Sequence, residues 1–233
     1  MAIIRGRIHN KIRWFLRTGF IGLTRELIYE LRHYQKSNYS QFNEQETLSR
    51  IVQQPTGIYV DVGAGRPITG SNSFFLYRRG WVGICIDPIR NNQILHKILR
   101  PRDIFLKVIC GRKAESVFYL FNPYEYSTTL EQVAIHVMDK YGDGIKLISK
   151  YPIPSLSLSE ILRRQEVKQI DFLNIDTEGA DLEVLKSLDW SVWRPLVIAI
   201  EAWPTAEEQV ADYLFQLGYQ FVQSCGPTLI FKL

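Results

Sequence analysis

The sequence contains few cysteines, and their spacing does not suggest a shared site. Only Cys85, Cys110 and Cys225 occur among 233 residues, and no C-x-x-C pair is present. This pattern argues against both a disulfide framework and a zinc site. Because Cys85 and Cys110 lie within apolar runs, we expect them to be buried thiols in the reducing cytoplasm.

The sequence also lacks a long apolar run. No stretch approaches the roughly 18 consecutive apolar residues that a membrane-spanning helix requires. The N-terminal region has no long apolar segment followed by a small-residue cleavage site, which argues against a signal peptide. We therefore expect a cytoplasmic protein, and a peripheral position at the membrane is the alternative.

Positive charge is concentrated at the start of the chain. The net charge of the whole chain is +4, whereas residues 1–40 hold eight Lys and Arg side chains against Glu26 and Glu30. The first 40 residues thus carry +6 and the remainder carries −2. This distribution argues against nucleic acid as a partner, because the groups that would steer it are confined to the N-terminal segment.

The basic segment has the apolar spacing of helices. Apolar residues recur at helical spacing from Ile4 to Phe15 and again from Leu23 to Tyr34, which predicts two amphipathic helices. We divide the chain into a basic helical arm at 1–50 and a second domain at 51–233. The arm is expected to pack on that domain or on a second subunit of a homo-oligomer. The alternative is that residues 1–40 contact a membrane surface.

The second domain alternates strand-like and helix-like segments. This alternation predicts a mostly parallel sheet with helices on both faces. The last two strand-like runs are separated only by Gly226 and Pro227, which leaves no room for a helix, so they form a hairpin and one strand is antiparallel. The less regular segment 111–156 is expected to contact the substrate. The strand-like runs are 57–62, 81–86, 104–110, 170–176, 195–201, 219–224 and 228–233.

A glycine turn follows the first strand-like run. Gly63 and Gly65 let the backbone adopt positive φ and approach a ligand closely, which predicts a nucleotide-like cofactor. A dinucleotide fingerprint requires a third glycine, and Ile68 stands at that position. Asp61, at the end of the run, suits a cofactor that carries a positive amino group, and S-adenosylmethionine is such a molecule.

A second acidic residue, Asp87, ends the next strand-like run. A carboxylate there can accept hydrogen bonds from both ribose hydroxyls of a nucleoside. The alternative is that Asp87 only caps the helix expected from Arg90.

Two sequence blocks resemble the FkbM family of S-adenosylmethionine-dependent methyltransferases. One extends from Val60 to Pro88, and the other, from Ile170 to Ser187, contains the IDTEG run at 175–179. The resemblance implies a Rossmann-like class I methyltransferase fold, an α/β fold whose seven-stranded, mostly parallel sheet ends in an antiparallel hairpin. It also implies the residues that bind the cofactor, which would be Asp61, Gly63, Ala64, Gly65, Ser71, Asn72, Asp87, Pro88, Val108 and Cys110. Among these, the resemblance implies that Ser71 and Asn72 hold the cofactor carboxylate near the start of the next helix.

Three carboxylates are expected at the ends of the fourth and fifth strands. Asp176 and Glu201 end these strands and Glu178 follows Asp176, so all three face one crevice at the carboxyl edge of the sheet. Asp176 is the first candidate for a general base or a substrate contact, Glu178 is the second, and His136 is a further candidate. The carboxylates alternatively bind substrate or cap the next helix. We expect no metal, but Asp176 and Glu201 would be the ligands of a divalent cation.

The resulting hypothesis is an enzyme that uses S-adenosylmethionine to methylate a hydroxyl of a sugar, a glycan or a glycosylated natural product, as in polysaccharide biosynthesis. The alternative is a non-catalytic binding or membrane-associated scaffold protein that keeps the methyltransferase fold. An NAD-dependent oxidoreductase is disfavoured, because Ile68 replaces the third glycine.

Overall fold

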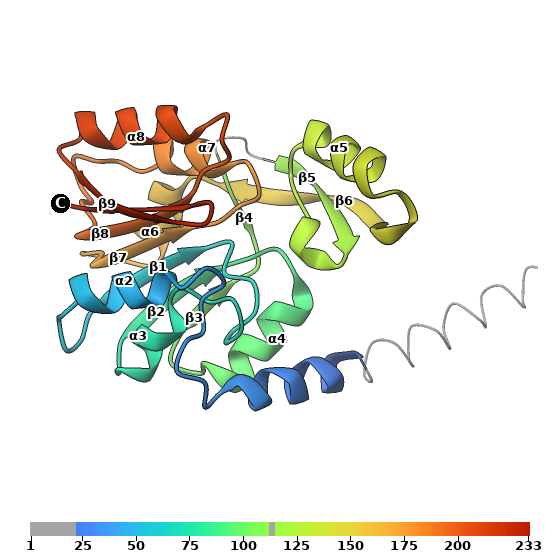
Figure 1. The fold of residues 1–233 in the computed structure, drawn as a ribbon, viewed down its shortest axis with the longest axis horizontal. Helices are drawn as coiled ribbons and strands as arrows, with labels where there is room; N and C mark the ends of the chain where they lie inside the picture. Colours follow the sequence, from blue (N-terminus) through green and yellow to red (C-terminus); the bar gives the residue numbers. More distant parts are fainter. Residues whose placement is uncertain (1–21, 112–114) are drawn as a thin grey trace, which may run out of the picture. The chain divides into compact units, whose positions relative to one another are not determined.

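A computed structural model describes residues 22–111 and 115–233 of the chain (Figure 1). The chain divides into two compact units between Ser37 and Asn38. In the first unit a helix extends from residue 22 to residue 33, as the spacing from Leu23 predicted, whereas the helix expected over 4–15 lies outside the described residues. Among the described helices, none combines the length and the hydrophobicity needed to cross a bilayer.

The second unit is built on a seven-stranded sheet in the order β3-β2-β1-β7-β8-β10-β9. The strands from β3 to β8 pair in parallel, and β10 pairs antiparallel with both β8 and β9. This topology confirms the Rossmann-like class I methyltransferase fold with its antiparallel C-terminal hairpin. The strands are β1 (Ile58–Val62), β2 (Val82–Ile86), β3 (Ile104–Leu106), β7 (Phe172–Ile175), β8 (Val197–Glu201), β9 (Gln220–Cys225) and β10 (Thr228–Lys232).

Helices cover both faces of this sheet (Figure 1). Alternate strand residues face opposite sides, so Val60 packs in one core and Tyr59 in the other. The first core is closed by α6 (Leu158–Arg164), α7 (Asp181–Lys186) and α8 (Glu207–Gln216). The second is closed by α2 (Glu44–Ile51), α3 (Phe74–Arg78) and α4 (Arg90–Leu99).

A smaller three-stranded sheet is inserted between β3 and α6. It has the order β4-β6-β5, with strands β4 (Ile109–Cys110), β5 (Glu115–Asn122) and β6 (Lys146–Leu156). Between β5 and β6 lie the short 3-10 helix η1 (Tyr124–Tyr126), the helix α5 (Glu131–Tyr141) and the 3-10 helix η2 (Gly142–Gly144). Figure 1 shows this insertion projecting to one side of the main sheet.

The prediction of one strand over 104–110 is wrong. The chain leaves the main sheet after Leu106, whose carbonyl accepts a hydrogen bond from the Asp87 N–H at 3.1 Å. It then pairs with β6, and the Gly111 N–H donates to the Leu156 carbonyl at 2.9 Å. The apolar run therefore contributes strands to two different sheets. Because its hydrophobicity is uninterrupted, the sequence does not show where one strand ends and the next begins.

Helix α2 belongs to the second unit, whereas the sequence analysis assigned residues up to 50 to the arm. Glu44 is fully buried, and its carboxylate accepts a hydrogen bond from the Thr228 hydroxyl at 3.1 Å. The Thr47 hydroxyl donates to the side-chain carbonyl of Gln223 at 3.0 Å. These polar contacts with β9 and β10 attach α2 to the sheet, and apolar spacing does not reveal them.

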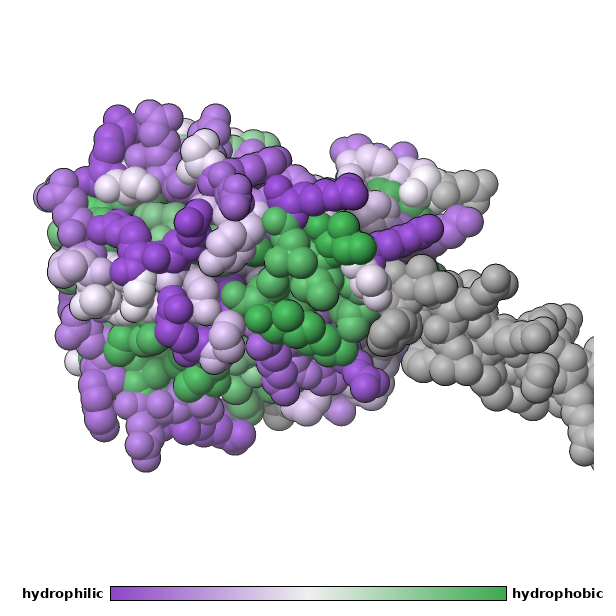
Figure 2. All heavy atoms as spheres, turned by 90° about the horizontal axis from the view of Figure 1, so that it is seen from below, coloured by the Kyte–Doolittle hydropathy of each residue, from purple (hydrophilic) through white to green (hydrophobic). Residues whose placement is uncertain are grey.

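Hydrophobic side chains also reach the surface, and Figure 2 shows one face of the molecule on which they gather. In the second unit, Val82, Ile98 and Ile104 are exposed near the β3 edge of the main sheet. Val82 and Ile104 are the first residues of β2 and β3. They therefore lie at the amino ends of the parallel strands. The predicted site residues are found at the other end, where these strands have their carboxyl ends.

Candidate active site

The glycine turn after β1 is held against the ends of β2 and β7. The N–H groups of Gly63 and Ala64 both donate to the Ile86 carbonyl, at 2.9 and 3.1 Å. Gly63 has a φ of 77° and Gly65 a φ of 53°. A Cβ added at Gly63 would lie 1.5 Å from the backbone oxygen of Asp176, so both the conformation and the space require glycine.

Asp87 joins the same turn to the start of α4. Its Oδ2 accepts from the Gly65 N–H at 3.1 Å, and its Oδ1 accepts from the Ile89 N–H at 2.7 Å and from Asn92 Nδ2 at 3.2 Å. Burial raises the pKa of Asp87 to about 7. Because each carboxylate oxygen has two lone pairs, Oδ2 keeps one for a ligand and Oδ1 is already saturated. Asp87 thus holds the turn before α4 without accepting, among the described hydrogen bonds, from a backbone N–H of the helix itself, and ribose binding by it stays a prediction.

A buried arginine holds the remainder of the loop. The guanidinium of Arg100 donates to the Pro67 carbonyl at 3.2 Å, to Ser71 Oγ at 3.3 Å and to Ser73 Oγ at 2.9 Å. Its Nε pairs with Asp103 at 2.7 Å, and both side chains are inaccessible to solvent. The predicted cofactor loop, residues 63–73, is therefore held in place by the buried charge of Arg100.

Ser71 occupies the N–H groups at the start of α3. Its Oγ accepts from the Ser73 N–H at 3.3 Å and from the Phe74 N–H at 3.1 Å. These are the donors that a cofactor carboxylate was expected to use. The structure therefore places Ser71 inside the loop as a cap, and its contact with a cofactor stays a prediction.

A chain of side-chain hydrogen bonds crosses from β1 to β7. Asp61 is 1% exposed and accepts from Ser73 Oγ and, at 2.9 Å, from Asn174 Nδ2. The Oδ1 of Asn174 accepts from Asn72 Nδ2 at 3.2 Å. The Oδ1 of Asn72 is buried and has no hydrogen-bond partner among the described residues. Burial raises the pKa of Asp61, and the nearby Arg100 opposes this rise.

The structure brings the three predicted carboxylates together at the ends of β7 and β8. One oxygen each from Asp176, Glu178 and Glu201 lies within 4.8 Å of the others. Burial and then mutual repulsion raise the pKa of Asp176 well above its usual range and that of Glu178 to about 8. The same causes raise the pKa of Glu201 to about 8, against a hydrogen bond with Trp203. This cluster binds protons at neutral pH or stabilises a positively charged ligand.

The loop that carries Glu178 is held by the carboxylate of Asp181, the first residue of α7. Asp181 Oδ1 accepts from the Thr177 N–H at 2.7 Å, and its Oδ2 accepts from the Gly179 N–H at 3.0 Å. These bonds close a turn in which Glu178 has a φ of 54° and Gly179 a φ of 101°. A left-handed backbone conformation is uncommon for glutamate, and the two hydrogen bonds that Asp181 accepts stabilise the turn around it.

The inserted sheet borders both the glycine loop and the acidic cluster. The guanidinium of Arg66 lies 5.1 Å from the ring centroid of Tyr124 and 3.8 Å from the carboxylate of Glu125. The Thr128 hydroxyl donates to the Glu178 carbonyl at 3.2 Å. Residues of the insertion therefore contact both halves of the predicted crevice, and the contact of 111–156 with a substrate stays a prediction.

The remaining predicted residues lie around this centre. Pro88 is partly buried beside Asp87, and Val108 is partly buried against the core that contains α6 to α8. The Cys110 thiol is buried, and that burial raises its pKa to about 12 despite a hydrogen bond with Ser187. His136 is exposed on α5 and is not a member of the acidic cluster.

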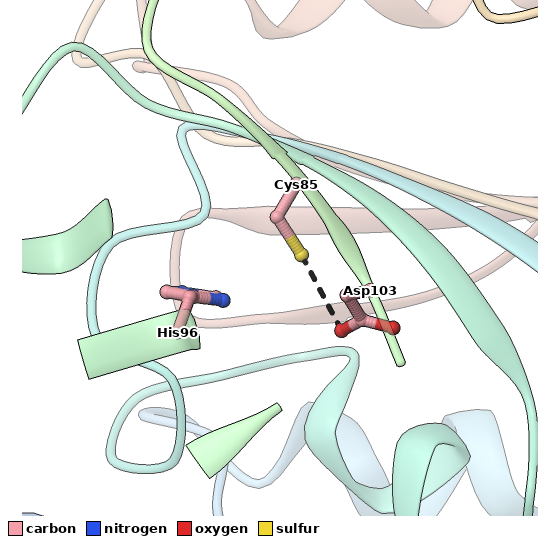
Figure 3. Close-up of side chains that lie close together, drawn as sticks. All are labelled: Cys85, His96 and Asp103. Atoms are coloured by element: carbon pink, nitrogen blue, oxygen red, sulfur yellow. Dashed lines mark hydrogen bonds between the residues drawn. The ribbon is translucent and has the colours of Figure 1, made fainter. Parts of the chain in front are cut away.

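A second group of ligand-type side chains lies beneath the cofactor loop, and Figure 3 shows Cys85, His96 and Asp103 close together. The Cys85 thiol donates to Asp103 Oδ2 at 3.7 Å. The same oxygen accepts from Arg100 at 2.7 Å and from the Tyr59 hydroxyl at 2.6 Å. Burial raises the pKa of Cys85 well above its usual range. Since Arg100 already supplies a cation here and the thiol stays protonated, this group stabilises the loop and does not suit a metal ion.

Sequence reasoning missed Asn174 and Arg100. The sequence does mark Asn174, because it is the one polar residue within the β7 run Phe172–Ile175. It also lies two residues before Asp176, so the two-residue period of a strand would direct both side chains to the same face. Arg100 had none, since it lies in a run that resembles an exposed basic turn, Leu99-Arg100-Pro101-Arg102.

The sequence model of one family, described as Methyltransferase FkbM domain, matches residues 61–221. None of the curated proteins matches the chain. Among solved structures, it is similar to a precorrin-6y C5,15-methyltransferase from Geobacter metallireducens GS-15, with 11% identity, a TM-score of 0.45, and coverage of 84% of this chain and 90% of that one. It is also similar to a putative rRNA-methylase from Clostridium thermocellum, with 14% identity, a TM-score of 0.38, and coverage of 84% and 95%.

Proposed function

The chain belongs to the FkbM methyltransferase family, and we propose that it transfers a methyl group from S-adenosylmethionine to a hydroxyl of a sugar, a glycan or a glycosylated natural product. One observation carries the proposal. The glycine turn packs directly against the backbone of Asp176, so the predicted cofactor loop and the acidic cluster are adjacent. A cofactor and a proton acceptor are then available at one place.

The residues around the turn suit this cofactor. Three features favour a ligand that carries hydroxyl donors and positive charge. They are the buried Asn72 oxygen that has no partner among the described residues, the remaining lone pair of Asp87 Oδ2, and the acidic cluster. S-adenosylmethionine has both, and when bound it supplies an electrophilic methyl group on a sulfonium. The glycine turn at 63–65, Asn72 and Asp87 would hold it.

The carboxylates would activate the acceptor. A sugar hydroxyl is a weak nucleophile, and a base within hydrogen-bond reach removes its proton as the new oxygen–carbon bond forms and the sulfur–carbon bond breaks. Asp176 is the proposed base, because its raised pKa makes its ionised form a stronger proton acceptor than an ordinary aspartate. Glu178 and Glu201 would hold the acceptor hydroxyl and the released proton nearby.

A divalent cation is the second way in which this cluster would act. Asp176 and Glu201 would be its ligands, since hard cations take carboxylate oxygens. The distinguishing measurement is methyl transfer after dialysis against EDTA. Full activity of the dialysed protein excludes a required cation, and activity restored only by Mg²⁺, Mn²⁺ or Ca²⁺ supports one.

The insertion would supply contacts with a sugar. Arg66, Tyr124 and Thr128 lie along the border between the insertion and the crevice. Trp203 is beside Gly179, where a Cβ would lie 3.7 Å from its ring. Polar groups with neighbouring aromatic rings suit a hydroxylated ring better than an apolar acceptor.

Two measurements on Asp176→Asn test the proposal. We expect calorimetry to show that the variant still binds S-adenosylhomocysteine, while transfer of radiolabelled methyl to glycan acceptors falls by about 100-fold or more. Asp212→Asn, on the exposed face of α8, is the control and should behave as the unmodified protein. The proposal fails if the unmodified protein does not bind S-adenosylhomocysteine, or if Asp176→Asn transfers methyl at the normal rate.

A further inference from the structure

We propose that Asn72 accepts a hydrogen bond from the α-ammonium group of the cofactor, and that Asn174 and Asp61 fix the orientation of the Asn72 amide for this contact. The inference rests on the proposed use of S-adenosylmethionine. It differs from the sequence-based expectation, in which Asn72 holds the cofactor carboxylate and Asp61 alone faces the amino group.

The donor and acceptor of each hydrogen bond in this chain can be assigned by starting from Arg100, at its buried end. Arg100 has only donors, so Ser73 Oγ accepts from it at 2.9 Å and directs its own proton to Asp61. Burial raises the pKa of Asp61, while Arg100 and the hydrogen bonds from Ser73 and Asn174 oppose that rise in favour of the ionised, acceptor-only form. The side chain that contacts the other oxygen of Asp61 must therefore present a donor.

That requirement orients two amides in turn. Asn174 directs its Nδ2 toward Asp61 at 2.9 Å, which leaves its Oδ1 to face Asn72. Asn72 must then direct its Nδ2 toward Asn174, at 3.2 Å, and present its Oδ1 away from the chain. The oxygen and nitrogen of Asn72 are thus assigned by a connected network that begins at a group with no acceptor.

The oxygen at the end of this chain lacks a partner. Asn72 is 7% exposed, and within the described part of the chain its Oδ1 is buried without a hydrogen bond. Such a group destabilises the protein unless a ligand or a water satisfies it. Because the free atom is an acceptor, its ligand must be a donor, so an ammonium group fits and a carboxylate does not.

The position of Asn72 agrees with this assignment. Its partner Asn174 pairs with Asp61 across β1 and β7, and lies two residues before Asp176. The backbone oxygen of Asp176 packs against Gly63 of the glycine turn. The Asn72 Oδ1 is therefore close to the place where the predicted cofactor loop meets the acidic cluster. A ligand that contacts both would lie there.

Calorimetry with two ligands that differ only in the ammonium group tests the inference. One is S-adenosylhomocysteine, and the other is its desamino analogue, 4-(5′-adenosylthio)butanoate. The unmodified protein should bind S-adenosylhomocysteine about 10- to 100-fold more tightly, which is the effect of a hydrogen bond to a charged group. Asn72→Leu, of similar shape but without polar atoms, should lose this preference, whereas Asn72→Asp keeps an acceptor and should retain it.

Asn174→Leu tests the positioning role. The variant leaves Asn72 in place but removes the group that orients its amide, so the preference for S-adenosylhomocysteine should decrease and the affinity for the analogue should stay unchanged. A purely structural role would weaken both ligands equally, and thermal unfolding of each variant checks that it is folded.

The outcomes separate this inference from the proposed function. If the unmodified protein binds both ligands equally, the Asn72 oxygen is satisfied by water and the inference is overturned, while methyltransferase function stands. A preference retained in Asn72→Leu overturns it as well. If the unmodified protein binds neither ligand, the proposed function itself is overturned.

Discussion

Gly63 packs against the backbone carbonyl of Asp176 so closely that a Cβ at position 63 would lie 1.5 Å from that oxygen. We expect Gly63→Ala to separate the cofactor loop from the acidic cluster, to destabilise the protein by about 3 kcal/mol or more, and to abolish binding of S-adenosylhomocysteine. Urea unfolding and calorimetry measure the two effects.

Gly70 provides a matched control for the backbone conformation. Its φ of 75° is close to the 77° of Gly63, but a Cβ there would have no described atom within 4 Å. Gly70→Ala should therefore cost only the strain of a left-handed residue, about 1–2 kcal/mol. Equal losses in the two variants would show that strain, and not the contact with Asp176, determines the requirement for glycine.

Arg100 is the only cation that contacts the buried side of the cofactor loop among the described hydrogen bonds, through Pro67, Ser71 and Ser73. Arg100→Met leaves Asp103 and Asp61 buried without a compensating charge, and we expect a loss of about 3–5 kcal/mol in the free energy of unfolding. The exposed pair of Arg163 with Asp189 is the control. Arg163→Met should cost about 0–1 kcal/mol, and a similarly small loss for Arg100→Met would contradict the assigned role.

Much of the fold follows from the sequence because local patterns and topology agree. The Gly226-Pro227 turn has no room for a helix, and β9 and β10 form the expected hairpin around it. Prediction from the sequence fails where one apolar run contributes strands to two different sheets. Nothing in the residues from Ile104 to Cys110 marks the point at which hydrogen bonding passes from β2 to β6, because that point depends on partners far along the chain.

The site is predicted less completely than the fold, for a physical reason. Asp176, Glu178 and Glu201 were identified because parallel strands place their ends at one edge. Residues that act through long-range hydrogen bonds left weaker signals. Asn174 depends on the register between β1 and β7, and Arg100 depends on a turn whose burial is set by the loop above it. Such contacts are determined by tertiary packing and not by spacing along the chain.

Buried carboxylates should make the folded protein less stable at alkaline pH. Burial raises the pKa of Asp87 to about 7 and those of Glu178 and Glu201 to about 8, above their values in the unfolded chain. The folded state then binds more protons than the unfolded state from about pH 4 to pH 8. The stabilisation is fully present below about pH 4, is lost progressively as the pH rises, and is gone above about pH 8. We expect the midpoint of thermal unfolding to fall between pH 4 and pH 8.

Glu201→Gln tests whether the acidic cluster causes this fall. The substitution removes one of three neighbouring charges, so the variant should melt several degrees above the unmodified protein at pH 9 and close to it at pH 4, since about 1 kcal/mol shifts the midpoint by about 2–4 °C at this chain length. Glu208→Gln, exposed on α8, is the control and should keep the original pH dependence. A profile unchanged by Glu201→Gln would place the titrating groups elsewhere.

The division of the chain after Ser37 predicts where the arm can be removed. Tyr39 belongs to the body, because its carbonyl accepts from the Gly70 N–H at 2.7 Å, its ring packs edge-on against Phe74 and its hydroxyl accepts from Arg78. Deletion of residues 1–37 should leave binding of S-adenosylhomocysteine intact. Deletion of residues 1–40 also removes Tyr39 and should weaken that binding, since the cofactor loop loses its anchor at Gly70.

Deletion of residues 1–37 also tests what the basic arm does. We propose that it contacts an anionic membrane surface or a second subunit, and its net charge of +6 over residues 1–40 favours the former. Cosedimentation with vesicles that contain phosphatidylglycerol and light scattering of the free protein distinguish the two. Binding to vesicles that disappears on deletion of residues 1–37 supports the membrane contact, and a change from dimer to monomer supports the subunit contact. If neither property changes while cofactor binding is preserved, the arm has no role in either contact and both proposals fail.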